Sequence, residues 1–171
     1  MSQQPYPTPP EPPEVPRKLN LSAGQIAAIV LLLIFPVLMI VGAFGESIDE
    51  ADASSADVHL SAVYPSRLRF LLDSDMQITV ENTSQQTLDG LSVHLETGYI
   101  DQFTAISFMP PVSAATDDAY IVPLPDLAPG ESGVVTVQFQ GSHYGQHEGR
   151  VWVTRSGQTA AELQVSSIVY P

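Results

Sequence analysis

Two hydrophobic patterns divide the 171-residue chain. From Ile26 to Phe44, nineteen residues carry no charged side chain, so a helix there would be apolar on every face. From Val58 onward, apolar and polar residues alternate with a period of two, as in "DMQITVENTS", "GLSVHLET" and "SGVVTVQFQG". The first pattern predicts one helix, and the second predicts a series of half-buried β-strands.

The length of the apolar run (residues 26–44) indicates a membrane helix. It would span roughly 28 Å as a helix, close to the roughly 30 Å hydrocarbon core of a bilayer. Pro36 inside the run is tolerated in a membrane helix but would break a helix in water. The alternative is a secretory signal, whose apolar core is usually about 7–15 residues and is followed closely by a small-x-small site. Here the run is longer and "ADA" at 51–53 lies too far downstream, so we predict a permanent transmembrane helix over residues 24–45.

Charge is distributed unevenly around this run. Arg17 and Lys18 precede it, and no Lys or Arg follows until Arg67. The positive-inside bias therefore predicts a cytoplasmic N-terminus and a C-terminal part that is periplasmic or extracellular, on a single-pass protein of the inner (cytoplasmic) membrane. From Glu46 onward, seventeen acidic residues face four arginines, and this accounts for the whole net charge of −13. Such an acidic body would be repelled by nucleic-acid phosphates and by anionic lipid headgroups, which argues against both as direct partners.

Two segments flank the apolar run. Residues 1–23 are dense in proline, which predicts a disordered cytoplasmic tail. "PEVPRK" also fits a PxxPx+ ligand pattern through Pro13, Pro16 and Lys18, although such short motifs are common by chance. Residues 46–57 are acidic and rich in small residues, which predicts a solvated linker between the membrane and a domain at 58–171.

The domain at 58–171 has the pattern of an all-β fold. Its eight or nine alternating segments are separated by turn sequences such as "ENTSQQ", "LDG", "LAPGES" and "RSGQ". No window shows a helical period of 3.6 residues. Short strands without interleaved helices predict an antiparallel β-sandwich with one buried and one solvated face on each sheet.

A family resemblance supports this fold. "ITVENTS" followed by "LDGLSVHLET", "LPDLAPGESGVVTVQFQ" and "HEGRVWVT" resembles the immunoglobulin-like and fibronectin-III-like modules of bacterial cell envelopes, including the CARDB type. The family positions are filled by Asn82, Leu127, Pro129, Gly130 and Gly149, and the resemblance covers roughly residues 58 to 170. Trp152 departs from the antibody pattern because it lies late in the chain. The resemblance implies a fold and leaves the function open.

The chain offers few candidates for chemistry. It has no cysteine, which excludes disulfides and thiolate sites. In "GSHYGQHEG", a glycine-rich loop could gather His143, His147 and Glu148 around Cu²⁺ or Zn²⁺, while an exposed hairpin loop is the simpler interpretation. His94 is expected to face solvent, and the acidic pair in "DSD" (73–75) is interpreted as loop charge. Because no G-x-S-x-G, H-E-x-x-H or P-loop motif is present, we expect no enzymatic activity and no cofactor.

One apolar stretch departs from strict alternation. "ETGYIDQFTAISFMPPVS" concentrates bulky apolar side chains, which either belong to the core on both faces or form an exposed patch for a protein partner. The residues of this predicted patch are Tyr99, Phe103, Ile106, Phe108 and Met109.

Together these patterns predict a single-pass membrane protein with one extracytoplasmic immunoglobulin-like β-sandwich. The predicted role is binding or scaffolding, as an accessory subunit or interaction partner of another membrane or envelope protein. The alternative is a periplasmic module that binds a metal or small ligand through the His143–His147 loop. Neither the partner nor the oligomeric state follows from the sequence.

Overall fold

The computed structural model describes residues 22–40 and 45–171. The predicted tail lies almost wholly outside these residues, and so do residues 41–44 of the apolar run. Ala23–Ile40 form helix α1, with Pro36 inside it. Among the described residues, no helix combines the length and the hydropathy needed to cross a bilayer. The helix and the β-rich part belong to two separate compact units, and the rest of this subsection concerns the second.

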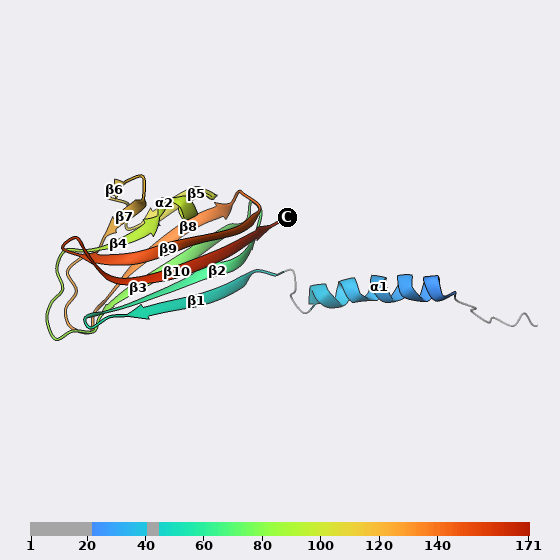
Figure 1. Cartoon of the computed structure of the whole chain (residues 1–171), viewed down its shortest axis with the longest axis horizontal. Coiled ribbons are helices and arrows are strands. Elements are labelled where there is room, and N and C mark those ends of the chain that lie inside the picture. Colours follow the sequence, from blue (N-terminus) through green and yellow to red (C-terminus); the bar gives the residue numbers. More distant parts are fainter. Residues whose placement is uncertain (1–21, 41–44) are drawn as a thin grey trace, which may run out of the picture. The chain divides into compact units, whose positions relative to one another are not determined.

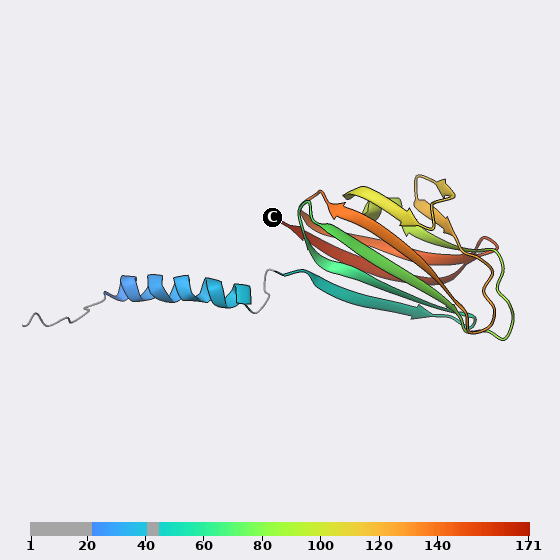
Figure 2. The ribbon, with the colours of Figure 1, turned by 180° about the vertical axis from the view of Figure 1, so that it is seen from behind.

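Within residues 45–171, ten strands form a sandwich of two layers (Figure 1 and, from behind, Figure 2). The first layer contains β1 (Ser47–Ser54), β2 (Val58–Arg69), β3 (Asp73–Asn82), β8 (Ser132–Gly141) and β5 (Phe103–Met109). The second layer contains β10 (Gln158–Tyr170), β9 (Gly145–Arg155), β4 (Leu91–Glu96), β7 (Ala119–Pro123) and β6 (Ala114–Ala115). Within each layer the strands pair antiparallel, which confirms the predicted all-β class.

The core lies between the layers and is built from the alternating positions. In β3 the residues Met76, Ile78 and Val80 are fully buried, while their neighbours in the strand are half-buried or exposed. The same alternation holds along β4, β8 and β9. The period of two therefore predicted which face of each strand is buried, because successive side chains of a strand point to opposite faces.

Strand β2 joins the two layers. Its apolar and polar residues alternate in two stretches, "ADVHLSAVYP" and "SRLRFLLD", which would indicate two strands. The structure has one strand whose burial changes phase at Tyr64 and Pro65, both buried. Beyond this point Arg67–Arg69 pair in parallel with Ile168–Tyr170 of β10. The prediction of a purely antiparallel sandwich is therefore wrong at this contact, and Phe70 forms a further parallel bridge with Gly141. The phase change lets β2 leave the first layer and hydrogen-bond with the second.

The predicted linker at 46–57 is largely a strand. Ser47–Ser54 form β1, which pairs antiparallel with β2 from Arg67 to His59. Ala51 and Ala53 pack against the core, while the acidic side chains are exposed. The solvated-linker interpretation is corrected here, because backbone pairing with a neighbouring strand stabilises a segment that has few apolar side chains of its own. Its exposed carboxylates also oppose pairing with another chain at this sheet edge.

A short helix and a glycine create the site of the largest fully buried side chain. Helix α2 (Thr97–Ile100) interrupts the chain after β4, where no helix was predicted, and places Tyr99 in the core. A Cβ atom added to Gly149 on β9 would overlap the Tyr99 side chain. The Tyr99 hydroxyl is 2.8 Å from Ser167 Oγ, and Ser167 Oγ donates to the carbonyl of Pro65 at 2.6 Å. Burial raises the pKa of Tyr99 far above its usual value.

The side chain of Asn82 hydrogen-bonds to two loops at one end of the sandwich, the β3–β4 loop and the β7–β8 loop. Its fully buried side chain donates from Nδ2 to the carbonyls of Gln86 and Leu127, both at 2.8 Å. Its Oδ1 accepts from the backbone and the hydroxyl of Ser84 at 2.9 and 2.8 Å. The interpretation of this residue as turn chemistry is confirmed by these contacts.

Candidate functional site

The structure divides the predicted apolar patch in two. Tyr99 and Phe103 are buried, with side chains 1% and 3% exposed, so including them in a partner-binding patch was wrong. Phe103 packs in the core against Phe139, with ring centroids 4.4 Å apart. Ile106 and Phe108 are half-buried, and Met109 is 74% exposed. Only the second half of the stretch therefore reaches the surface.

A bulge in β5 explains why alternation failed in this stretch. The pairing of β5 with β8 shifts register between Thr104 and Ser107, and Ala105 within the shift has a φ of 51°. An extra residue in one strand of a pair changes which face the following side chains occupy. Phe103 thus points into the core, while Ile106 and Phe108 only pack against its rim.

The exposed half of the stretch lies on an edge strand. β5 pairs with β8 and is the last strand of its layer. Phe108 packs on Tyr120 of β7, with ring centroids 5.4 Å apart, so this pair bridges the two layers. The Tyr120 hydroxyl donates to Asp101 Oδ1 at 2.7 Å, which raises the pKa of Tyr120. We call Ile106, Phe108, Met109 and Tyr120 the β5 edge patch.

The histidine loop does not assemble a metal centre. His143 is exposed, and its Nδ1 lies 3.1 Å from the carbonyl of Gln102. His147 Nε2 lies 2.7 Å from the carbonyl oxygen of His143, so this nitrogen is engaged by backbone. His147 and Glu148 are consecutive residues of β9 and therefore point to opposite faces. Within residues 22–40 and 45–171, no group of three His, Cys, Asp or Glu side chains is placed to hold a metal ion.

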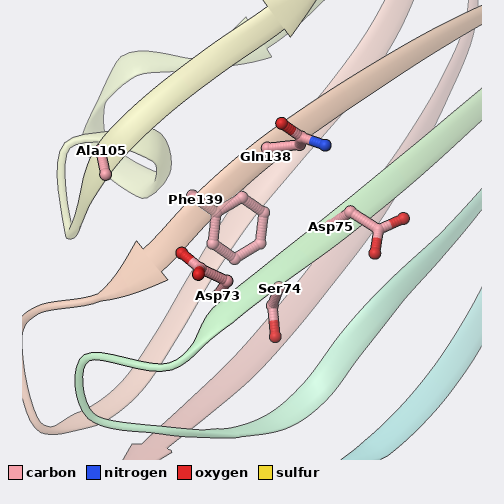
Figure 3. Close-up of a pocket in the computed structure, with 6 residues that line it drawn as sticks. All are labelled: Asp73, Ser74, Asp75, Ala105, Gln138 and Phe139. Atoms are coloured by element: carbon pink, nitrogen blue, oxygen red, sulfur yellow. The ribbon is translucent and has the colours of Figure 1, made fainter.

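A shallow pocket of about 360 Å³ lies beside the β5 bulge (Figure 3). Its lining residues are Asp73, Ser74, Asp75, Ala105, Gln138 and Phe139. The two carboxylates lie on strand β3, two residues apart, and not in a loop as the sequence suggested. Asp73 Oδ1 accepts a hydrogen bond from Gln140 at 2.7 Å, and Asp75 lies opposite Gln138 in the register. With both carboxylates exposed, the pocket offers a weakly negative surface and lacks the ligand number that Ca²⁺ requires.

The outer face of the second layer carries a polar and aromatic ladder that the sequence did not predict. His94 of β4 lies opposite Trp152 of β9, and their rings stack with centroids 5.2 Å apart. The Arg150 guanidinium lies 5.6 Å from the Trp152 ring, and its Nε contacts Glu96 at 3.3 Å. His94 Nε2 also lies 2.9 Å from Thr154 Oγ1. These side chains cover one another across the strands, which is the usual role of cross-strand pairs in a sheet.

His94 is therefore less exposed than its strand pattern suggested. It is half-buried between Trp152 and Thr154, and burial lowers its pKa from the usual 6.5. The sequence signal was present, since His94, Trp152 and Thr154 all occupy polar-face positions of their strands. Only the register between β4 and β9 shows that they meet.

Comparison with known proteins gives structural likenesses alone. No protein-family model and no curated protein matches the chain. The solution structure of a CARDB domain from Pyrococcus furiosus is 12% identical, with a TM-score of 0.47 over 66% of this chain and 94% of that one. A crystal structure of the same domain in complex with di-metal ions is 11% identical, with a TM-score of 0.43 over 71% and 93%. Red sea bream transglutaminase is 8% identical, with a TM-score of 0.42 over 67% of this chain and 18% of that one.

All three TM-scores are below 0.5, so the fold described above rests on the strand pairing of this chain itself. Two of the three are CARDB domains, the type of module that the sequence resembles.

Proposed function

We propose that the chain is a membrane-anchored interaction module, in which the β-sandwich binds another membrane or envelope protein through the β5 edge patch. The observation that carries this proposal is Met109, a large apolar side chain 74% exposed on the terminal strand of a layer. Exposed apolar side chains at a sheet edge are unfavourable in water, and a partner that covers them removes that surface from solvent.

Support for the anchor comes from the sequence. The apolar run extends to Phe44, four residues past the end of α1, and carries no charge over nineteen residues. The positive flank at Arg17 and Lys18 favours a cytoplasmic N-terminus. In this arrangement the acidic sandwich lies on the periplasmic or extracellular side.

A binding role is also favoured over a catalytic one by the chemistry on the surface. The histidine loop is engaged by backbone contacts. The residues that line the pocket in Figure 3 include two exposed carboxylates and the Ser74 hydroxyl, but no histidine that could activate this hydroxyl. A serine hydroxyl without an adjacent base is a weak nucleophile near neutral pH.

The anchor and its orientation are tested with the full chain in native membranes. A reporter enzyme that works only outside the cytoplasm should be active when it is fused after Pro171. The chain should also stay in the membrane fraction after washing at high pH. A reporter that works only in the cytosol would contradict the proposed orientation.

The β5 edge patch is tested by crosslinking from within it. A photo-crosslinking residue at Ser107, an exposed neighbour on β5, should give a discrete adduct in native membranes. Met109→Asp should abolish the adduct without changing the stability of the domain, because Met109 is mostly solvated. Gln164→Asp, at an exposed position of β10, serves as the matched control and should leave the adduct intact. Equal adduct yields from the two variants would refute the assignment of this patch. Phe108 is unsuitable as a test because it also packs against the core.

A further inference from the structure

Exposed apolar side chains gather at one end of the sandwich. The end of β2, the C-terminal end of β10 and the start of β1 meet there (Figures 1 and 2). The register places Ser47 and Ile168 on either side of the same residue, Arg67. The exposed residues at this end, which we call the Leu71 surface, are Ile48, Arg67, Leu71, Leu72, Tyr144 and Ile168.

The opposite end of the sandwich is different. Its loops comprise residues 55–57, 83–90, 124–131 and 156–157, and within them the leucines are buried. None of these loops exposes a large apolar side chain. The apolar character of the Leu71 surface is therefore specific to one end and is not a general property of the loops.

The backbone holds the Leu71 surface in place. The Leu71 amide donates to the carbonyl of Gly141 at 2.9 Å, and the Phe70 amide donates to the carbonyl of Tyr170 at 2.9 Å. The Phe70 ring packs on Tyr144, with centroids 4.7 Å apart. The β2–β3 turn, the β8–β9 loop and the C-terminal strand are thus tied to one another, and the turn presents Leu71 and Leu72 outward in a fixed arrangement.

Leu71 occupies a strained position. Its φ is 58°, in the left-handed region that favours glycine, and its side chain is 60% exposed. A leucine in this conformation is disfavoured relative to the right-handed region, because its Cβ lies too close to the following carbonyl oxygen. Neither burial nor backbone geometry explains a leucine here, and strained residues of this kind concentrate at functional sites.

Charges of both signs lie at this end of the sandwich, since Asp49 lines a shallow pocket together with Arg67, and Asp73 follows directly after Leu72. Arg67 and Arg69 are two of the four basic residues after Glu46, and both side chains are exposed. Arg69 also lies over the Tyr170 ring at 5.9 Å. Guanidinium groups bind phosphate oxygens in a bidentate geometry. Because Glu46 lies near Ser74 at the same end, the local charge is mixed, and apolar contact dominates over attraction to anionic lipid.

We propose that the Leu71 surface docks onto the bilayer, with Leu71 and Leu72 entering the interface and Arg67 contacting lipid phosphates. The proposal rests on the proposed anchor. Strand β1 begins at Ser47, three residues after the apolar run ends at Phe44, so an anchored run holds this end of the sandwich at the lipid surface. Docking restricts the orientations of the domain and so determines which surfaces face a membrane partner.

The test uses the full chain in phosphatidylcholine vesicles. Since the chain has no cysteine, His143→Cys in the β8–β9 loop and Gln85→Cys at the opposite end give two singly labelled proteins with an environment-sensitive dye. The dye at residue 143 should be quenched by spin-labelled lipid and shielded from aqueous iodide. The dye at residue 85 should show the reverse. Adding phosphatidylglycerol should change neither result.

A second variant separates docking from folding. Leu71→Gly, combined with the label at residue 143, should lower the ratio of docked to free domain about tenfold, because one apolar side chain no longer enters the interface. Its resistance to urea should be unchanged or higher, since glycine accepts a φ of 58° without strain. Chains that fail to float with the vesicles would overturn the anchor. Chains that float while residue 143 is as open to iodide as residue 85 would overturn the docking alone.

Discussion

Replacing Asn82, the last residue of β3, should destabilise the sandwich strongly, because its side chain holds the loops at this end. Asn82→Ala removes four side-chain hydrogen bonds, two donated to Gln86 and Leu127 and two accepted from Ser84. Each such bond contributes about 1 kcal/mol net, and the buried carbonyl of Leu127 is left without this donor. We expect the free energy of unfolding to fall by about 3–4 kcal/mol, which corresponds to about 10 °C in melting temperature for a domain of this size.

The assay follows the fluorescence of Trp152, the one tryptophan of the chain, during urea unfolding in non-ionic detergent. The midpoint should shift while the slope of free energy against urea stays constant. Ser84→Ala is the matched control and should cost about 1 kcal/mol, because its hydroxyl lies in a partly solvated turn. Asn82→Asp keeps the acceptors and loses both donations, so it should be at least as unstable as Asn82→Ala. A loss no larger for Asn82→Ala than for Ser84→Ala would refute the reasoning.

Two further changes test the core and the ladder. Gly149→Ala should cost about 3 kcal/mol, because the new Cβ overlaps Tyr99, whereas Gly98→Ala, with open space around it, should be neutral in the same urea assay. Burial holds the pKa of His94 below 6.5, so the folded protein binds this proton more weakly than the unfolded chain. The contribution of His94 to the free energy of unfolding should therefore be full above about pH 6.5 and be lost as the pH falls through the folded-state pKa. Urea titrations at several pH values measure this dependence. If the His94→Gln variant keeps the same dependence, another group is responsible.

The strands that could be predicted are those with strict alternation. In β3 and β8 the period of two predicts which side chains face the core. Strand geometry is local, because successive side chains point to opposite faces, so an apolar residue indicates the buried face. Asn82 and Gly130 were likewise recognisable as turn residues, since a turn needs a particular side chain or a positive φ at a particular place.

The candidate sites depended on contacts between distant residues. Tyr99 and Phe103 looked like a possible surface, but a four-residue helix places Tyr99 in the core, and the bulge at Ala105 separates the buried Phe103 from the more exposed residues that follow. Neither feature has a strong local signal in the sequence. The stacking of His94 on Trp152 depends on the register between β4 and β9. These two residues are 58 positions apart in the chain, and no local sequence pattern shows that their strands pair.

By itself, the sequence determined that the chain has one apolar segment followed by an acidic, cysteine-free domain of alternating strands. These properties depend on composition and on local geometry. Only the tertiary structure decided that residues 47–54 are a strand, that β2 pairs with both layers, and that Phe70, next to Leu71, meets Tyr144 and the C-terminal strand at one exposed end. Those outcomes are set by backbone pairing and packing between segments far apart in the chain, which no local pattern encodes.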